Sequence, residues 1–492
     1  MKTLTRRSFL KNSLLAASAV SLPVHSWAQV LGANDDIRVA VVGFNGRGGG
    51  HINEFRKIKG VRVVALCDVD RKVLERGAKA FQDRNESVET YTDVRKLLEN
   101  TNIDAITTAT PNHWHALISI WACQAGKDVY VEKPVSHNVW EGRQIVEAAR
   151  KYHRIVQTGT QSRSKHALRE AFAWLKEGNL GKIKVARGLC YKRRPSIGKT
   201  SGPQPIPESV DYDLWCGPAP NDPPRRNGSH GPIHYDWHWF WNYGCGDVGN
   251  QGIHQMDVAR WALGKDALSP KVISVGGRFA YVDDGETPNT QFVVHDYGDA
   301  LLIFEVRGLP SKAGIETAQD SGDKKSKKEV MDQYRGESVG VVVECEGGYL
   351  ADTVAHDKEG KVIKEFSGGE SHQQNFIDAV RSRKPGDLNA DILEGHLSSA
   401  LCHTGNISYR LGQQANPDEV REALKAAPAA LETLARFEEH LAANDVDLKK
   451  TKATLGVFLK MDPKTERFIH NSKANELLTR HYRKPFVVPE KV

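Results

Sequence analysis

Between residues 37 and 158, short apolar runs alternate with stretches of helical periodicity. The runs lie at 37–42, 61–67, 103–109, 129–131 and 155–158. Apolar runs this short are typical of strands buried on both faces, and alternation with helices requires parallel strands joined by crossovers. We therefore predict a doubly wound parallel sheet over residues 35–160.

The rhythm changes after residue 160. A helical pattern at 165–176 precedes a strand-like run at 184–191, and a Pro- and Gly-rich segment extends to residue 249. Strand-like runs then follow one another at 271–306 and 338–355 without helices between them, which favours antiparallel pairing. We predict a second α/β domain at 161–412 with an open, mostly antiparallel sheet. The helical periodicity through 417–443 predicts a helical C-terminal extension at 413–492.

The N-terminus has the features of an export signal. Arg6 and Arg7 precede Ser-Phe-Leu-Lys, an apolar stretch spans 14–24, and Ser26-Trp27-Ala28 supplies small residues for cleavage. This pattern predicts a twin-arginine signal peptide at 1–28 and a periplasmic protein. The apolar stretch is shorter than the roughly 20 residues that a membrane-spanning helix needs, so we expect no stable membrane insertion. Because this pathway carries folded proteins, we expect a tightly held cofactor.

Charge and cysteine content limit the classes of partner and ligand that we expect. The formal net charge is +7, but no arginine-rich helix or nucleic-acid-reading motif accompanies it, so we expect no nucleic-acid partner. The seven cysteines are scattered and form no Cys-x-x-Cys pair. Neither a metal site nor a disulfide framework is therefore expected.

A glycine-rich turn follows the first apolar run. It reads Gly43-Phe44-Asn45-Gly46-Arg47-Gly48 and precedes a helical pattern. Gly43 suits a tight turn, Gly48 allows close packing of helix and strand, and a helix N-terminus presents free N–H groups to a pyrophosphate. Asn45 stands where the usual dinucleotide fingerprint has its middle glycine, and a plain tight turn is the alternative.

Asp68 supports the dinucleotide interpretation. It ends the second apolar run, 20 residues after Gly48, where a carboxylate can bind the hydroxyls of an adenosine ribose. No arginine follows it directly to pair with a 2′-phosphate, and Arg71 is the nearest. We therefore expect NAD rather than NADP. The alternative role for Asp68 is a helix cap.

Lys133 follows another buried run, at the carboxyl end of a strand, where ligands bind in open α/β sheets. A partly desolvated lysine beside a nicotinamide has a lowered pKa and can relay a proton from a hydroxyl. Pro134 favours a fixed turn after it.

Two segments, Thr110-Pro111-Asn112-His113-Trp114-His115 and 125–134 with its Glu132-Lys133-Pro134, resemble the Gfo/Idh/MocA family of sugar and inositol dehydrogenases. With the glycine turn, the resemblance covers residues 37–412. It implies a Rossmann domain, an α/β domain built on an open sheet, a cis bond before Pro134, and a homodimer or homotetramer formed through that sheet. It also implies cofactor contacts from Thr110, Pro111, Asn112, His115 and Glu132, with Lys133 directed at a carbohydrate or polyol substrate.

A third segment, 246–257, resembles the family signature D-x-G-x-H-x-x-D, in which His254 would be the acid/base residue. Asn250 stands where the family usually has Asp. An amide can bind a hydroxyl but cannot take its proton, so we expect the proton relay to fall on His254 and Lys133. We also expect Asn250, Tyr191 and Trp239 to contact substrate, Trp239 from the aromatic run 235–243, because aromatic rings stack on sugar faces. The other role for that run is packing.

These features predict an NAD-dependent oxidoreductase that transfers hydride between a secondary hydroxyl of a sugar or polyol and a tightly bound nicotinamide. An alternative is a redox-assisted glycoside hydrolase, which oxidises transiently, eliminates the aglycone, adds water and returns the hydride. A third hypothesis is a sugar sensor without catalysis.

Overall fold

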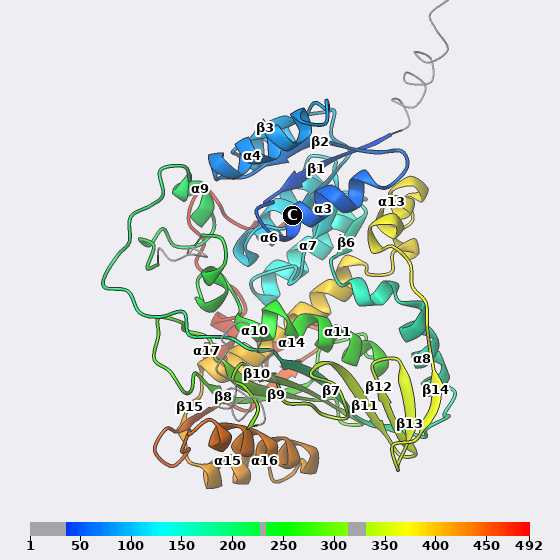
Figure 1. The fold of residues 1–492 in the computed structure, drawn as a ribbon, viewed down its shortest axis with the longest axis vertical. Helices are drawn as coiled ribbons and strands as arrows, with labels where there is room; N and C mark the ends of the chain where they lie inside the picture. The colour runs from blue at the N-terminus through cyan, green and yellow to red at the C-terminus, as the bar shows by residue number, and fades with distance from the viewer. Residues whose placement is uncertain (1–35, 227–232, 313–330) are drawn as a thin grey trace, which may run out of the picture.

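The structure is a computed structural model that describes residues 36–226, 233–312 and 331–492 (Figure 1). The predicted signal peptide lies outside these ranges. No helix within the described ranges has the length and apolar content needed to cross a membrane.

The N-terminal domain is a six-stranded, wholly parallel sheet with the order β3-β2-β1-β4-β5-β6. This confirms the predicted doubly wound domain. Its strands are β1 Ile37–Val42, β2 Val61–Cys67, β3 Glu89–Tyr91, β4 Ala105–Thr108, β5 Asp128–Val131 and β6 Val156–Thr158. The helices that follow the first five strands are α3 Arg47–Arg56, α4 Arg71–Gln82, α5 Val94–Leu98, α6 Asn112–Gln124 and α7 Val139–Lys151.

Both faces of the central strand β1 are buried. Alternate residues of β1 enter different clusters: Ala40 and Val42 pack with α6 and α7, and Val39 and Val41 pack with α3 and α4. This two-sided burial explains why the strands read as continuous apolar runs.

The second domain contains a large mixed sheet with the order β14-β13-β12-β11-β7-β10-β9-β8-β16-β15. Among its described strands only β7 and β10 pair in parallel, so the predicted, mostly antiparallel sheet is confirmed. Its strands before residue 412 are β7 Ile183–Tyr191, β8 Lys271–Gly277, β9 Thr290–Asp296, β10 Leu301–Arg307, β11 Val339–Cys345, β12 Gly348–Ala351, β13 Val354–Asp357 and β14 Val362–Glu365. The other elements before residue 412 are η1 Gln161–Ser164, α8 His166–Lys176, α9 Tyr212–Cys216, η2 Asp236–Trp239, α10 Gly246–Asn250, α11 Gly252–Ala262, α13 His372–Ser382, η3 Pro385–Asp387 and α14 Ile392–Arg410.

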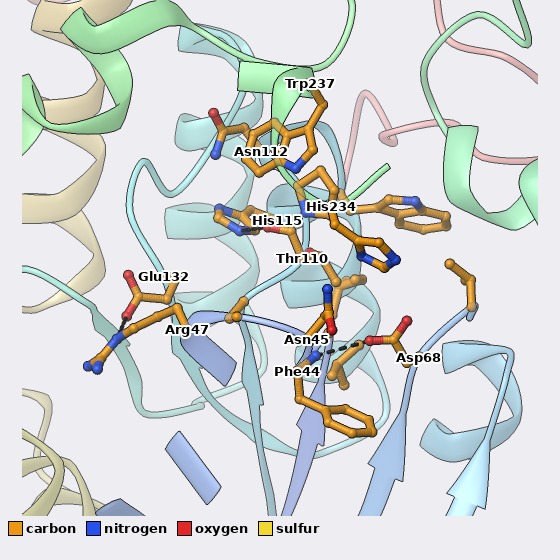
Figure 2. A pocket seen from close by; sticks show the side chains of 18 of the residues that line it. Phe44, Asn45, Arg47, Asp68, Thr110, Asn112, His115, Glu132, His234 and Trp237 are labelled. Atoms are coloured by element: carbon orange, nitrogen blue, oxygen red, sulfur yellow. Dashed lines mark hydrogen bonds and ion pairs between the residues drawn. The ribbon is translucent and has the colours of Figure 1, made fainter. Parts of the chain in front are cut away.

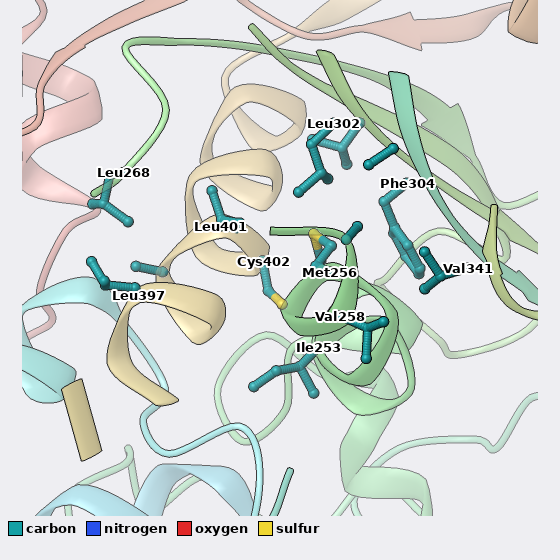
Figure 3. Packing of buried hydrophobic residues seen from close by; sticks show 14 of the residues in the cluster. Ile253, Met256, Val258, Leu268, Leu302, Phe304, Val341, Leu397, Leu401 and Cys402 are labelled. Atoms are coloured by element: carbon teal, nitrogen blue, oxygen red, sulfur yellow. The ribbon is translucent and has the colours of Figure 1, made fainter. Parts of the chain in front are cut away.

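One face of this sheet carries the main hydrophobic core. Ile253 and Met256 of α11 and Leu401 of α14 pack against Leu302 and Phe304 of β10 (Figure 3). Helix α14 also packs against α7 of the first domain. It therefore fixes the position of α11, and with it the residues of α11 that face the first domain.

Residues 413–492 are not simply a helical extension. Besides α15 Pro417–Leu424, α16 Pro428–Ala443 and α17 Ser472–Glu476, they form β15 Gln413–Ala415, β16 Ala453–Leu455, β17 Leu459–Asp462 and β18 Arg467–Phe468. Strands β16 and β17 both pair with β8 and so extend the large sheet. Short strands that add to an existing edge leave little periodic signal in the sequence.

Helices α15 and α16 cover the second face of the sheet over β8, β9 and β10 (Figure 1). Phe437 of α16 packs edge to face on Phe292 of β9, with ring centroids 5.5 Å apart. One face of the sheet through which the resemblance implies oligomers is thus partly occupied by the chain's own C-terminal helices.

Candidate functional site

A cavity of about 470 Å³ lies where the carboxyl ends of β1, β2, β4 and β5 meet the second domain. Figure 2 shows its wall, to which residues from both domains contribute. The cavity brings together most of the predicted site: Gly43, Asn45, Gly46, Arg47, Asp68, Thr110, Pro111, Asn112, His115, Glu132, Lys133, Asn250 and His254. Gly48, Tyr191 and Trp239 do not line it.

The glycine turn has the geometry expected of a phosphate cradle. Gly43 has φ +73°, and a Cβ on Gly48 would lie 2.0 Å from the carbonyl oxygen of Gly43. Gly46 caps α3 without a side-chain hydrogen bond. Because glycine has no side chain that could cap the helix, the first N–H groups of α3 are left for a ligand. A helix N-terminus of this kind can bind a pyrophosphate.

Gly48→Ala should separate α3 from the turn. Because the added methyl overlaps main-chain atoms, we expect the free energy of unfolding to fall by about 1–3 kcal/mol and dinucleotide binding to be lost. Gly46→Ala is the matched control for stability, since its Cβ meets no atom within 4 Å. Denaturant melts and the dinucleotide content of the purified variants measure both effects. Wild-type content in Gly48→Ala would show that this close packing is not needed.

Asp68 lies at the cavity and Asp70 is the helix cap. The Asp70 carboxylate accepts a hydrogen bond from Lys72 N at 3.0 Å and caps α4. Asp68 accepts from the backbone N–H groups of Phe44 and Asp70, each at 3.1 Å. Burial raises the pKa of Asp68, and these two hydrogen bonds oppose the rise. The alternative role of Asp68 as a cap is therefore not the one observed.

His115 joins two cofactor-side loops. Its Nδ1 lies 2.6 Å from the carbonyl oxygen of Pro134, and its Nε2 lies 2.7 Å from that of Thr110. The ring is almost fully buried, and burial lowers its pKa. His115 thus ties the end of β4 to the end of β5 as well as lining the cavity.

Glu132 is the centre of a buried polar cluster. Arg47 Nε and His51 Nε2 each lie 2.9 Å from its Oε1. Burial would raise the pKa of this carboxyl, but the hydrogen bond from His51 and the positive charges around it hold the pKa well below its usual range. His51 was missed in the sequence, because its only signal is a place on α3 facing β4, where Nδ1 lies 2.6 Å from the Thr107 hydroxyl.

Lys133 crosses from the first domain to the second. Its peptide bond to Pro134 is cis, as expected, and its Nζ donates a hydrogen bond to the main-chain oxygen of Asn250 at 2.7 Å. That oxygen is available because α10 ends at Asn250, and His254 N bonds to Gln251 O instead. Burial lowers the pKa of Lys133.

His254 lies at the same wall as Lys133. Burial, followed by the charge of Lys133, lowers the pKa of His254 to about 3. The imidazole is therefore neutral near pH 7 and can accept a proton. Asp257, one turn later, is buried and accepts two hydrogen bonds from Arg163 Nε at 2.9 and 3.0 Å. It anchors α11 to η1.

Two predicted substrate residues lie elsewhere. Tyr191 is 1% exposed, and its hydroxyl donates to Glu305 at 2.8 Å on the sheet face covered by α16. Trp239 is buried beneath the Arg194 guanidinium, 5.3 Å from its ring centroid. Strand alternation turns Tyr191 toward α16 and away from the cavity, and the tight turn η2 directs Trp237 rather than Trp239 to the cavity.

The second domain covers the side of the cavity lined by Asp68. His234 Nε2 lies 3.0 Å from the Asp70 carboxylate, and Arg71 N donates to Ser209 O at 2.9 Å. Asp211 N donates to Val69 O at 2.9 Å. These contacts hold residues 209–211 and His234 against the loop after β2. Within the described ranges, no group of three or more His, Cys, Asp or Glu residues could hold a metal ion.

Comparison with known proteins identifies the family. The model of the oxidoreductase family GFO_IDH_MocA, NAD-binding Rossmann fold, matches residues 37–160, and the model of its C-terminal alpha/beta domain matches residues 175–303. Together they cover just over half of the chain. The chain belongs to the Gfo/Idh/MocA oxidoreductase family. Its first domain is thus an NAD-binding Rossmann domain, and the cavity lies at its cofactor edge.

Individual relatives of this Gfo/Idh/MocA member are partial matches. Glycosyl hydrolase family 109 protein 2 of Shewanella sp. strain ANA-3 is 32% identical over 171 residues, covering 30% of this chain and 38% of that protein. The glycosyl hydrolase family 109 protein of Shewanella pealeana is also 32% identical over 171 residues, covering 30% and 37%. The chain therefore matches less than two fifths of the length of these curated relatives.

Solved structures share the fold. The WlbA dehydrogenase from Bordetella pertussis, in complex with NADH and UDP-GlcNAcA, has a TM-score of 0.52 at 18% identity and covers 74% of this chain and 94% of its own. GenD2 from gentamicin A biosynthesis, in complex with NAD, has a TM-score of 0.51 at 18% identity, with coverage of 75% and 92%.

Proposed function

We propose that this Gfo/Idh/MocA oxidoreductase transfers hydride between a secondary hydroxyl of a sugar or polyol and a tightly held NAD. The observation that carries the proposal is the meeting of Lys133 and His254 at the cavity that the glycine turn and Asp68 also line. A dinucleotide site and a pair of proton-handling groups on one wall are what hydride transfer from a hydroxyl requires.

The residues present fit a dinucleotide. The start of α3, where Gly46 supplies no side-chain cap, would hold the pyrophosphate, and Asp68 would bind the adenosine ribose. When bound, the nicotinamide accepts or returns the hydride. NAD is favoured over NADP because Arg71, the arginine nearest to Asp68 in the sequence, already donates to Glu208 O at 2.8 Å.

Lys133 and His254 divide the proton chemistry. The neutral His254 can take the hydroxyl proton, and the Lys133 ammonium can hydrogen-bond the oxygen on which negative charge develops. The Asn250 carbonyl orients the Lys133 amine. Because neither the amide nor the carbonyl of Asn250 can ionise, the relay depends on the other two groups.

A second candidate is a redox-assisted glycoside hydrolase on the same scaffold. The named relatives are glycosyl hydrolase family 109 proteins. Transient oxidation that returns its hydride needs no external pool of cofactor. This suits the periplasmic location that we propose from residues 1–28, where a dinucleotide would have to be carried inside the folded protein.

One pair of assays distinguishes the dehydrogenase, the glycoside hydrolase and the sensor hypotheses. Nitrophenyl glycosides are incubated with the protein while NADH absorbance is followed in parallel with free sugars and polyols. NADH formed from a free sugar supports the dehydrogenase, and coloured product without net NADH supports the hydrolase. If neither coloured product nor NADH forms, the result would support a sensor and overturn both enzymatic proposals. Purified protein should also release NAD on denaturation, and its complete absence would contradict a tightly held cofactor.

A further inference from the structure

Residues 208–216 follow the first strand of the second domain but pack on the first domain. This segment, defined here as the strap, contains α9, and Figure 1 shows α9 beside the first domain. Leu214 and Trp215 of the strap line the cavity. The strap is therefore a part of the cavity wall that the other domain contributes.

The order of the strands identifies the end of the cavity that the strap covers. Strands β2 and β3 lie on one side of β1, and β4 and β5 lie on the other. Lys133 follows β5, whereas Asp68 follows β2, and residues 92–94 after β3 also line the cavity. With the ribose at Asp68 and the reacting end at Lys133, the adenine falls at the loops after β2 and β3.

The loop after β2 holds the first part of the strap. Val210 pairs with Asp70 in an antiparallel bridge, between the two main-chain hydrogen bonds that join residues 209 and 211 to this loop. The Arg71 guanidinium adds a hydrogen bond to Glu208 O at 2.8 Å. The strap thus pairs with the same loop that carries Asp68.

Helix α6 holds the second part of the strap. Trp114 Nε1 donates to the main-chain oxygens of Leu214 and Trp215, at 2.9 and 3.0 Å. His113 Nε2 lies 2.9 Å from the same oxygen of Trp215. Gly217 follows the strap with φ +48°, and a Cβ there would lie 2.2 Å from the Trp114 ring. The strap therefore ends in close contact with α6.

The C-terminal tail, residues 479–492, holds the strap from outside. The Arg483 guanidinium donates to the Asp213 carboxylate at 2.6 Å, to Asp213 O at 2.7 Å and to Gly217 O at 3.0 Å. Phe486 is 1% exposed and packs edge to face on Trp114, with ring centroids 5.4 Å apart. Neither Arg483 nor Phe486 lines the cavity, so they act on it only through the strap and α6.

We propose that the strap encloses the adenosine part of the dinucleotide, with Leu214 and Trp215 against it, and that Arg483 keeps the strap closed. The dinucleotide then exchanges only when the strap leaves α6, because an enclosed ligand is released at the rate at which its cover opens. This inference rests on the proposed function and goes beyond it, since it assigns the retention of NAD to residues that never contact it.

Exchange of bound NAD for radiolabelled NAD tests this role. Purified holoprotein is mixed with an excess of radiolabelled NAD, and the label bound to protein is followed over time by gel filtration. Arg483→Ala removes three hydrogen bonds to the strap and its end but no group of the cavity wall. We expect exchange to be faster by about 10-fold or more, because hydrogen bonds from a charged donor no longer oppose opening.

Arg421→Ala is the matched control. Arg421 also pairs with carboxylates, those of Asp418 and Glu438, but on α15 and α16 and away from the strap. Its variant should exchange NAD at the wild-type rate.

A reversible cross-link tests the strap in the opposite direction. Asp70 and Val210 are a non-hydrogen-bonded antiparallel pair, whose Cα atoms lie about 4.5 Å apart, a separation that a disulfide spans. Oxidised Asp70→Cys/Val210→Cys should keep its NAD almost without exchange, and reduction with dithiothreitol should restore exchange. Comparison of the two redox forms cancels the loss of the Asp70 cap, which both share.

Two results would overturn the role of the strap. One is a wild-type exchange rate in folded Arg483→Ala, and the other is equal exchange in the cross-linked protein, verified by mass spectrometry, and in its reduced form. If Arg483→Ala does not fold, the cross-linked protein decides alone. A wild-type protein that binds no NAD would instead contradict the proposed function.

Discussion

Replacing Lys133 by alanine is expected to lower kcat by about 10²- to 10⁴-fold and to leave the dinucleotide in place. The ammonium stabilises the substrate oxygen, whereas the proposed pyrophosphate and ribose contacts come from the start of α3 and from Asp68. The measurement is turnover on whichever substrate the assays above identify, together with the NAD content of the purified variant. Unchanged kcat would show that Lys133 does not stabilise the substrate oxygen during turnover.

The same variant should change the titration of its neighbours. The charge of Lys133 lowers the pKa of both His254 and His238, so its removal should raise both values from about 3. NMR titration of the two imidazoles in Lys133→Ala tests this directly. Lys192→Ala is the control: it removes an exposed lysine whose charge lowers the pKa of Lys133 but which does not line the cavity. It should retain most of the activity.

The first domain was predictable because its signals are local. Five of the six strands read as short apolar runs, and the glycine turn must follow the first of them. The edge strand β3 is exposed or half-buried at each residue, so it leaves no apolar run and was missed. The sequence left Asp68 with two roles, and only the structure shows that Asp70 takes the cap.

For Tyr191 and Trp239, the sequence indicated the right segments but not the direction in which the side chains point. Tyr191 ends a correctly predicted strand, but which face a strand turns to the site depends on tertiary packing. Trp239 belongs to a run in which six of the nine residues are Phe, Trp or Tyr, and the 3₁₀ turn η2 decides which rings face the cavity. His51 could not be chosen from spacing, because its partner Glu132 is far away in the sequence.

The C-terminal region shows a third kind of limit. The sequence indicates the helices α15 and α16 by their periodicity, but β16 and β17 are short and acquire their pairing from β8. Strand formation there is a property of the sheet edge and not of the residues alone.

Mild acid should destabilise this protein steeply, because several histidines are buried in neutral form. His113, His295 and His403 are at most 4% exposed, and burial lowers the pKa of each from 6.5 to about 3. Between these values the unfolded chain binds a proton at each site and the folded chain does not. Stability is therefore lost as the pH falls from 6.5 toward 3.

The size of the effect follows from proton linkage. Three protons correspond to about 4 kcal/mol of unfolding free energy for each pH unit. Glu141 acts in the opposite sense, since burial raises its pKa from 4.5 to about 7 and the folded state then holds the extra proton between those values. The net expectation from these four groups is about 3 kcal/mol per pH unit between pH 5 and 6. Other buried histidines with lowered pKa values add to it, namely His115, His137, His372 and His396.

His295→Leu isolates one of these protons. His295 lies on β9, away from the cavity, so the variant should reduce the pH dependence of the unfolding free energy by about 1.4 kcal/mol per pH unit while leaving dinucleotide binding unchanged. Urea melts at pH 5.0, 5.5 and 6.0 give the slope. His166→Gln is the control, because its side chain is 43% exposed and meets water in both states. An unaltered slope in His295→Leu would mean that His295 is protonated, or reaches water, in the folded protein.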